Sequence, residues 1–265
     1  MDKALIGHTG FVGGNLARQA AFEATYNSKN IEELRGRRFG EIWCAGVVAA
    51  KWWANQHPEE DLAGIDRLLD CLAQVEAKRF VLISTVDVYL DPQGVDEATP
   101  LDTAGLHAYG RHRLEVERFV ASHFPQHHII RLPGLFGRGL KKNIIYDFLH
   151  ENQLENIHAG GVFQFYGLHD LKRDLDQVVG AGIPLMNFAT EPVSVREVAQ
   201  KAFGRDFTHD TGRPPARYDM HTRHAAVLGG AGNYIWDRDK VLAEIAAYVK
   251  DARPAPVPGP HDRQG

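Results

Sequence analysis

The chain has 265 residues, of which 44% are hydrophobic and 24% charged, and its formal net charge at pH 7 is -4. Such values are ordinary for a globular protein with one large domain, or one domain and a small lobe. A slightly acidic chain gives no electrostatic reason to expect nucleic acid or an anionic membrane as a partner.

Three further features bear on the compartment. No apolar run approaches the about 20 residues that a membrane span needs. The chain opens directly on a strand pattern and a glycine loop, which leaves no room for a signal peptide. Its two cysteines, Cys44 and Cys71, stand in apolar contexts typical of buried thiols in a reducing compartment. We therefore expect a cytoplasmic protein.

The first half of the sequence alternates short apolar runs with helical patterns. Residues 3–6 form an apolar run, followed by the glycine loop GHTGFVGG and a helical pattern. Further buried strands are predicted at residues 23–26, 41–46, 80–85 and 128–133. Helices are predicted over 109–124 and from Pro58 onward, where Pro58 and the acids Glu59, Glu60 and Asp61 suit a helix start. This alternation predicts an α/β fold, a Rossmann-type doubly wound parallel sheet.

The pattern loosens after about residue 134, and beyond residue 140 we predict a small C-terminal substrate lobe. The predicted organisation is a dinucleotide-binding Rossmann domain over 1–140, a mixed substrate-binding region over 141–250 with some segments returning to the main sheet, and a proline-rich tail over 251–265, expected to be disordered. Within the lobe, helices are predicted at 143–152, at 194–203 with Ser194 as N-cap, and at 237–250, and extended segments at 163–168 and 185–189.

Three glycines, Gly7, Gly10 and Gly13, follow the first predicted strand at the spacing GxxGxxG. Glycine at these places permits a tight turn, a close approach of backbone N–H groups to a pyrophosphate, and packing of the helix on the strand. Directly after the first strand of an alternating series, the pattern predicts a dinucleotide site. We expect the cofactor to contact the three glycines together with Thr9, Phe11 and Val12.

The end of the second strand bears on which dinucleotide is bound. An acid there would bond the ribose hydroxyls of NAD, but the segment YNSKN offers Asn27, Ser28 and Lys29 and no acid. Lys29 can neutralise a 2′-phosphate, which favours NADP slightly over NAD. A polar loop that merely contains lysine is the alternative interpretation.

Several motifs together resemble a known family. GHTGFVG, CAG after a later strand, ST…VY at a strand end and Tyr109 on the next helix are similar to those of extended short-chain dehydrogenase/reductases. The likeness is to NAD(P)-dependent nucleotide-sugar epimerases, dehydratases and dTDP-4-dehydrorhamnose-reductase-like enzymes, and runs from residue 3 to about residue 203. RLPGLFGRG and LMNFATEPVSVREVAQ resemble two further family segments. The resemblance implies further cofactor contacts at Cys44, Ala45, Gly46, Ser84, Tyr109, Arg113 and Pro133.

The resemblance also implies a catalytic set. Thr85, four residues before Tyr89, would position the substrate oxygen, and Tyr109 would be the acid/base. Arg113 stands where the family has a lysine that bonds the nicotinamide ribose and lowers the tyrosine pKa. A fixed positive charge favours the phenolate, but the planar fork of arginine differs in shape from an ammonium, so its reach to the ribose is open. The alternative is that Tyr109 and Arg113 merely share a helix surface.

Asp87 is the remaining catalytic candidate. Side chains alternate along an extended segment, so Thr85 and Asp87 of STVDVY can point the same way. Dehydratases that resemble this chain often place an acid at this position and a second acid directly after the threonine, where this chain has Val86. The pattern therefore leans away from dehydration. Asp87 can instead cap the following loop.

The substrate candidates are mostly cationic or amide side chains. Lys142 and Asn143, after Lys141, stand at a predicted helix start, a place suited to an anion. The resemblance makes Asn143 a contact of the nucleotide-sugar diphosphate, while Gln164 replaces an arginine common in such enzymes. Lys51, followed by two tryptophans, is expected to line the sugar pocket. The alternatives are solvated lysines with a helix cap, and tryptophans that only pack.

These observations leave three functions open. The first is an NAD(P)-dependent oxidoreductase or epimerase acting on a nucleotide-linked sugar or similar carbonyl substrate. The second, motivated by Arg113 and Gln164, is a catalytically impaired NAD(P)-binding sensor or scaffold. A sugar-nucleotide dehydratase rests on Asp87 alone. We expect no metal, because the chain's 14 histidines form no recognisable ligand motif, and by analogy a homodimer through the helices beside Tyr109.

Overall fold

The structure is a computed structural model that describes residues 2–252. Its centre is a six-stranded sheet with the order β10-β6-β4-β3-β1-β2, in which all five pairings are parallel. The strands are β1 (Lys3–Ile6), β2 (Ala24–Tyr26), β3 (Arg38–Cys44), β4 (Glu76–Thr85), β6 (His127–Leu132) and β10 (Leu185–Asn187). The predicted doubly wound α/β class is thus confirmed.

The order of the strands places a ligand site at one edge of the sheet. The chain runs from β1 outward to β2 and then returns to β3 on the other side of β1. Ligands of open parallel sheets bind beyond the carboxyl ends of the strands at such a reversal. Ile6 pairs with Cys44, so the loops after β1 and β3 leave the sheet side by side.

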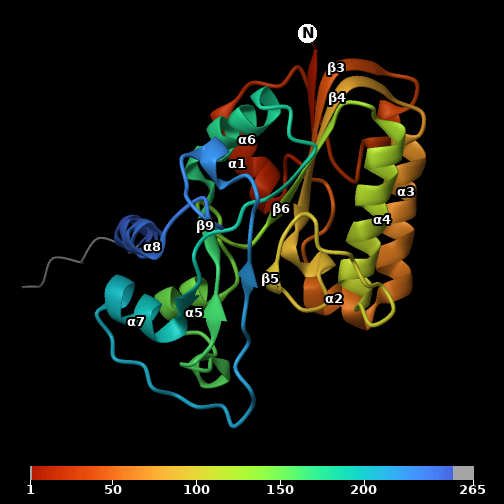
Figure 1. The fold of residues 1–265 in the computed structure, drawn as a ribbon. Coiled ribbons are helices and arrows are strands. Elements are labelled where there is room, and N and C mark those ends of the chain that lie inside the picture. Colours follow the sequence, from red (N-terminus) through yellow and green to blue (C-terminus); the bar gives the residue numbers. More distant parts are fainter. Residues whose placement is uncertain (1, 253–265) are drawn as a thin grey trace, which may run out of the picture.

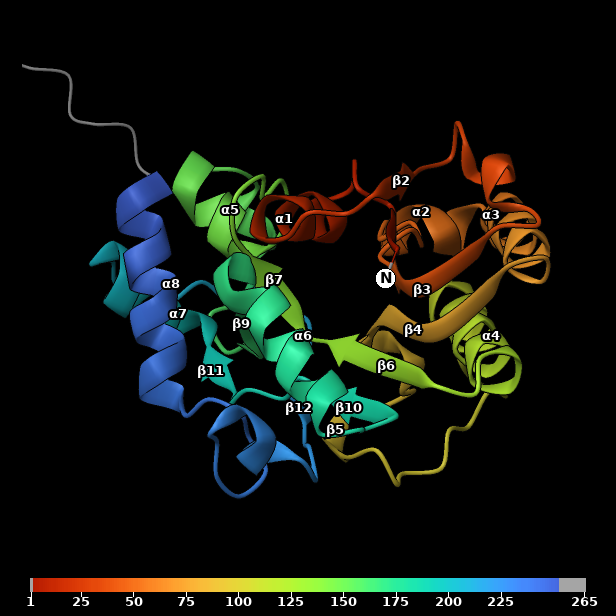
Figure 2. The same cartoon turned by 90° about the horizontal axis from the view of Figure 1, so that it is seen from above.

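Helices cover both faces of the sheet, as Figures 1 and 2 show. On one face lie α3 (Pro58–Leu72) and α4 (Ala108–His123), which bury Leu68 and Val120 in one apolar cluster. On the other lie α1 (Phe11–Gln19) and α6 (Leu171–Gly180), within a second cluster. Apolar residues on both sides explain why the strands read as nearly continuous hydrophobic runs.

The start of α3 and the docking of α4 have identifiable causes. α3 begins with Pro58 at its first turn, followed by three acids, as the sequence predicted. Helix α4 is tied to β6 by a buried ion pair in which Arg131 Nη2 lies 2.7 Å from Glu117 Oε2. Both side chains are 4% exposed, so each charge depends on the other.

Apart from α8, the remaining elements are short, and most of them form the C-terminal lobe and its connections. Three two-stranded pairs join β11 to β8, β12 to β5 and β7 to β9. Their bounds are β5 (Gln93–Val95), β7 (Gly134–Phe136), β8 (Val162–Phe163), β9 (Phe165–Gly167), β11 (Val193–Ser194) and β12 (Asp219–Met220), and the helices are α2 (Lys51–Gln56), α5 (Ile144–His150), α7 (Val195–Phe203) and α8 (Arg238–Ala252). Single 3₁₀ turns occupy Ile31–Leu34, Val86–Val88, Leu154–Asn156, Leu168–Asp170 and Ala225–Leu228.

One boundary agrees with the sequence prediction, one differs, and two helices were not predicted. Ser194 caps α7 in a reciprocal capping box with Glu197, as its position before the apolar pattern predicted. The predicted disordered tail was placed too early, because Asp251 and Ala252 complete the last turn of α8; the rest of that tail lies outside the described residues. Helices α2 and α6 were not predicted. Among residues 2–252, no helix is both long and apolar enough to cross a bilayer.

Candidate active site

The glycine turn (residues 7–13) has no room for side chains at two of its glycines. Gly7 has φ +87°, and a Cβ added to it would lie 2.3 Å from the carbonyl oxygen of Ala45. A Cβ on Gly13 would lie 2.1 Å from the carbonyl oxygen of Gly7. Gly46 is equally confined, because its Cβ would meet Ile6 Cγ2 at 2.7 Å. The loops after β1 and β3 are therefore packed backbone against backbone.

The helix that follows this turn has a free N-terminus. Gly10 is the N-cap of α1, and no side chain caps the helix. Gly10 N–H bonds the carbonyl of Gly7 at 2.9 Å, which closes the turn, while Thr9 and Gly10 stay exposed. Unpaired N–H groups of Phe11 and Val12 at a helix start form an anion site, so the residues present fit the pyrophosphate of a dinucleotide.

The loop after β2 is organised by local hydrogen bonds. His8 Nδ1 donates to the carbonyl of Tyr26 at 3.0 Å, which links the glycine turn to the end of β2. Asn27 Oδ1 accepts from the backbone of Lys29 at 2.8 Å, and the carbonyl of Ser28 accepts from Arg67. Ser28 and Lys29 are exposed. The loop thus leaves the Lys29 side chain free beside the place where an adenosine ribose would lie.

Tyr109 and Thr85 meet where α4 begins and β4 ends. Tyr109 is 6% exposed, and its backbone N–H donates to Asn55 Oδ1 at 3.0 Å. Burial raises the pKa of its phenol, whereas the charge of Arg113 and hydrogen bonding with Thr85 lower it, and the net direction is upward. Arg113 therefore acts in the predicted direction, but burial outweighs it and the phenol stays protonated at neutral pH.

Arg113 lies under the phenol ring, bound to an acid that the sequence argument did not single out. Its guanidinium carbon is 4.0 Å from the centroid of the Tyr109 ring. Both terminal nitrogens bond the carboxylate of Asp61, and one also bonds the carbonyl of Val48. His112 Nδ1 donates to the same carboxylate at 2.7 Å. Among the described residues Arg113 Nε has no partner, although it is buried.

Asp87 sits in a turn and not on an extension of the strand. β4 ends at Thr85, whose hydroxyl accepts from the backbone of Asp87 at 3.2 Å and starts the 3₁₀ turn. The predicted alternation of the two side chains along a strand therefore does not apply. The Asp87 carboxylate lies 2.7 Å from Lys51 Nζ on α2. Burial lowers the pKa of Lys51, but Asp87 and Tyr218 outweigh it, so this pKa is raised.

The three substrate candidates from the lobe have different surroundings. Lys142 Nζ bonds the carbonyl of Ala49, and burial lowers its pKa while the nearby Asp87 opposes this. Asn143 caps α5, accepting from two backbone N–H groups and donating to the carbonyl of Leu135. Gln164 is 2% exposed and its amide bonds the backbone of Thr190 and Met220. Of the three, only Lys142 is near the Asp87 carboxylate.

Three predicted cofactor contacts lie deeper in the sheet. Ser84, next to Thr85, donates to Glu117 Oε1 at 2.5 Å. Pro133 is buried directly after β6. Cys44 is fully buried at the end of β3, and burial raises the pKa of its thiol to about 11, so it contributes shape and no reactive sulfur.

Residues 27–178 match the model described as the NAD dependent epimerase/dehydratase family, more than half of the chain. The chain belongs to this family. Its members are NAD-dependent enzymes, as the sequence predicted, and the resemblance to nucleotide-sugar epimerases, dehydratases and reductases is confirmed. No curated protein matches the sequence significantly.

Solved structures with this fold include other members of the epimerase/dehydratase group. MoeE5 in complex with UDP-glucose and NAD superposes with a TM-score of 0.70 at 17% identity, covering 95% of this chain and 99% of its own. A dTDP-4-dehydrorhamnose reductase from Bacillus anthracis str. Ames, in complex with NADP, gives 0.72 at 15% identity, covering 96% and 100%. UDP-glucose 4-epimerase from Thermotoga maritima gives 0.67 at 12%, covering 95% and 99%. At these identities the superpositions establish the fold.

The structure of this epimerase/dehydratase family member also brings in residues that sequence reasoning missed. Around Tyr109 they are Asn55, Asp61, His107 and Tyr218. Asn55 and His107 hold the start of α4, since His107 accepts from Gly110 N–H at 3.0 Å. Tyr218 reaches both Lys51 and Asp87 from the C-terminal lobe. No sequence pattern identified Tyr218, because it belongs to a polar loop far along the chain.

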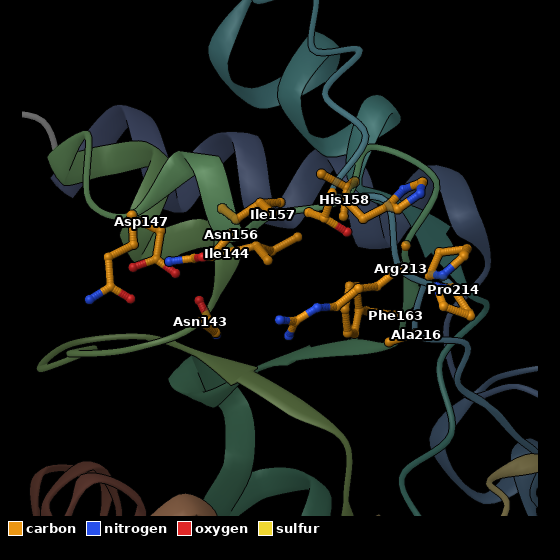
Figure 3. Close-up of a pocket in the computed structure, with 15 residues that line it drawn as sticks. Asn143, Ile144, Asp147, Asn156, Ile157, His158, Phe163, Arg213, Pro214 and Ala216 are labelled. Atoms are coloured by element: carbon orange, nitrogen blue, oxygen red, sulfur yellow. The ribbon is translucent and has the colours of Figure 1, made fainter.

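A cavity of about 370 Å³ opens in the lobe between the start of α5 and the segment after α7. Asn143, His158, Phe163 and Arg213 are among its lining residues. In Figure 3 the Arg213 side chain extends into the cavity toward Asn143. Within the described chain no hydrogen bond or ion pair engages the Arg213 guanidinium. An unpaired guanidinium in a cavity is a site for an anion.

Proposed function

We propose that the chain is an NAD(P)-dependent oxidoreductase or epimerase that acts on a nucleotide-linked sugar or similar carbonyl compound. The observation that carries this proposal is the pairing of the Tyr109 phenol with Thr85 at the carboxyl end of β4. That pair lies at the same edge of the sheet as the side-chain-free glycine turn and the free N-terminus of α1.

Each residue has a role that follows from its surroundings. When bound, the nicotinamide cofactor supplies hydride exchange with a substrate carbon. Tyr109 carries the proton of the substrate hydroxyl or carbonyl oxygen, and Thr85 holds that oxygen by a hydrogen bond. Because burial keeps the phenol protonated, Tyr109 is ready to donate a proton, the state that carbonyl reduction requires. Activity in that direction should persist through neutral pH and fall only once the phenol ionises.

Asp87 and Lys51 form the polar wall beside this pair. Lys51 and Asp87 come from the first half of the chain, and Tyr218 joins their ion pair from the C-terminal lobe. The two parts of the chain would therefore meet at the same substrate position. An acid here is also what a dehydratase would need to abstract a proton, which keeps dehydration as a weaker alternative.

For the cofactor we propose a preference for NADP. The loop after β2 has no acid to bond ribose hydroxyls, and the exposed Lys29 is free to meet a 2′-phosphate. Of the solved structures with the same fold, MoeE5 is a complex with NAD and the Bacillus anthracis reductase is a complex with NADP. The direct measurement is the ratio of NADPH to NADH affinity.

For the substrate we propose a sugar linked to a nucleoside diphosphate. MoeE5 and the Thermotoga epimerase are described with UDP-glucose. In this chain Asn143, which follows Lys142, lines the same cavity as Arg213, and the Arg213 guanidinium is available to a phosphate. Gln164, the residue that replaces the expected arginine, is engaged with backbone, so Arg213 supplies the cation instead.

The test is NADPH oxidation with a panel of 4-keto sugar nucleotides. Tyr109→Phe should lose at least about 100-fold in kcat, because general acid catalysis contributes about that much or more. Tyr248→Phe, which removes a phenol that packs against Phe136, is the matched control and should be unchanged. Equal turnover of the two variants would remove Tyr109 from the mechanism.

A second candidate, a catalytically impaired NAD(P)-binding protein, is favoured by one observation. The charge of Arg113 is matched by Asp61, so the guanidinium is not free to bond a ribose in the way a lysine would. This candidate predicts tight cofactor binding without turnover of any substrate. Arg113→Lys separates the two: a large gain of activity indicates an impaired site, and a loss indicates that arginine is the working residue.

We also propose a homodimer and a cytoplasmic location. The dimer would pair α3 and α4 of two copies, since these helices form the outer layer on their side of the sheet (Figure 2). Light scattering on a sizing column gives the oligomeric state. Substitution of exposed residues on α3 by glutamate should dissociate the dimer.

A further inference from the structure

We infer that Asp61 is a positioning residue that fixes the Arg113 guanidinium against the face of Tyr109 and offsets its charge. The inference rests on the proposed role of Tyr109 as acid/base. It goes beyond that role because it assigns the control of the phenol to an acid on a neighbouring helix, α3, which never touches the substrate.

The geometry is that of a closed set of three buried side chains. Asp61 is 5% exposed, Arg113 4% and His112 2%. The two terminal guanidinium nitrogens reach the two carboxylate oxygens as a fork, one at 2.9 Å, and His112 occupies the remaining side of the carboxylate at 2.7 Å. A bidentate pair of this kind fixes the plane of the guanidinium as well as its distance. That plane lies 4.0 Å from the Tyr109 ring centre.

Arg113 and His112 both hydrogen-bond the Asp61 carboxylate, and these two partners determine its charge. Burial raises the pKa of its carboxyl, but hydrogen bonds and charge from Arg113 and His112 outweigh burial, so the pKa is lowered. Asp61 is therefore ionised at neutral pH, and its negative charge faces the positive charge of Arg113. The negative charge of Asp61 opposes the effect of Arg113 on the phenol. Arg113 still lowers the pKa of Tyr109, and burial, which raises it, is the larger influence.

Other charged groups surround Tyr109 on the neighbouring elements. The turn after β4 supplies Asp87, which disfavours the phenolate, and α2 supplies Lys51, which favours it. These two are themselves paired at 2.7 Å. His107, before α4, has its ring centre 6.2 Å from that of Tyr109, and burial lowers its pKa, so it is neutral at pH 7. Of the charges around Tyr109, that of Arg113 is therefore the one whose compensation changes the pKa of the phenol most.

The experiment measures the phenol itself in cofactor-free protein. All eight tyrosines are replaced by a fluorotyrosine, which titrates at lower pH than tyrosine, and fluorine NMR follows each signal with pH. The signal of residue 109 is identified by its absence in Tyr109→Phe. Asp61→Asn should move its titration midpoint down by about 1 pH unit, because Arg113, still held by the carbonyls of Val48 and Tyr109, then acts uncompensated.

Two controls separate this effect from a general change of charge or structure. Glu59→Gln removes a charge from the exposed side of the same helical turn and should leave the midpoint in place. Asp61→Glu keeps the carboxylate and should restore the midpoint toward that of the parent protein. An unchanged or raised midpoint in Asp61→Asn would overturn the inference.

A second comparison covers the case in which Asp61→Asn does not fold. Arg113→Gln and the double variant Asp61→Asn/Arg113→Gln both lack the guanidinium, and the double variant has no unmatched buried charge. The midpoint should be lower in the double variant than in Arg113→Gln, because the Asp61 carboxylate has been removed; equal midpoints contradict the inference. Since neither cofactor nor substrate is added, the result is independent of whether the proposed enzymatic activity is correct.

Discussion

The two sides of the candidate site are built by different means. The cofactor side rests on a six-stranded parallel sheet, on backbone contacts that exclude side chains from Gly7 and Gly13, and on buried ion pairs beneath α4. The substrate side consists of two-stranded pairs, 3₁₀ turns and a polar loop around an open cavity. Under the proposed function, cofactor binding would depend on backbone geometry, whereas substrate choice would depend on individual side chains that can change without disturbing the fold.

The largest expected difference between the two sides is in the stability of buried and exposed ion pairs. Glu117→Gln leaves Arg131 buried without its counter-charge and should lower the free energy of unfolding by about 3–5 kcal/mol. Glu197→Gln, in the lobe, weakens an exposed pair with Arg238 and should cost about 1 kcal/mol or less. Urea denaturation measures both, and similar losses would mean that the two sides are not built differently.

The glycine turn provides the next test, on cofactor affinity. Gly13→Ala would place a methyl group on the carbonyl of Gly7 and, because such overpacking costs about 1–3 kcal/mol, should weaken NADPH binding about 10- to 100-fold. Gly14→Ala is the matched control, because its nearest contact is an ordinary 3.4 Å. Fluorescence titration with NADPH should show the loss in Gly13→Ala alone.

A smaller effect is expected on the substrate side. Arg213→Gln should weaken binding of UDP about 10-fold, because a charge-assisted hydrogen bond contributes about 1.5 kcal/mol or more, while NADPH affinity stays the same. Arg196→Gln, an exposed arginine on α7 outside the cavity lining, is the control. Calorimetry measures the affinity of both variants for UDP and for NADPH. A loss of NADPH affinity in Arg213→Gln would contradict the independence of the substrate side from the cofactor side.

The smallest expected effect concerns the choice between the two cofactors. Lys29→Ala should lower the preference for NADPH over NADH about 3- to 10-fold, since an exposed ion pair contributes only up to about 1 kcal/mol. Lys78→Ala removes an exposed lysine from the start of β4, at the opposite edge of the sheet. If both substitutions leave the ratio of affinities unchanged, Lys29 has no part in cofactor selection.

Much of the cofactor side could be predicted because its physics is local in sequence. Apolar runs mark strands buried on both faces, and glycines at fixed spacing mark a turn without side-chain room. The apolar spacing that indicated α4 was also present in α6, where Leu171, Leu175 and Val178 are buried. Charged residues stand between these apolar positions and make the segment polar in composition. Helix α6 was therefore not predicted, although the apolar spacing was present.

The rest depended on partners far apart in the chain. Asp61 and Arg113 are separated by 52 positions, and nothing in the spacing of either helix identifies the pair. Asp61 was predicted only as one of three acids that favour a helix start. Arg213 is one of many arginines in polar surroundings, and only the cavity distinguishes it. Long-range side-chain pairing therefore set the limit of what the sequence predicted about the site.

The short helix α2 has a consequence for altering the substrate range of this protein. Lys51 and Asn55 are four positions apart on it and so share one face. Lys51 fixes the Asp87 carboxylate, and Asn55 holds the backbone of Tyr109. A chimaera that replaces residues 48–57 but exchanges only single residues elsewhere in the pocket would displace the Asp87 carboxylate and the Tyr109 backbone at once. Chimaeras with other family members should therefore transfer this segment whole, together with the start of α4.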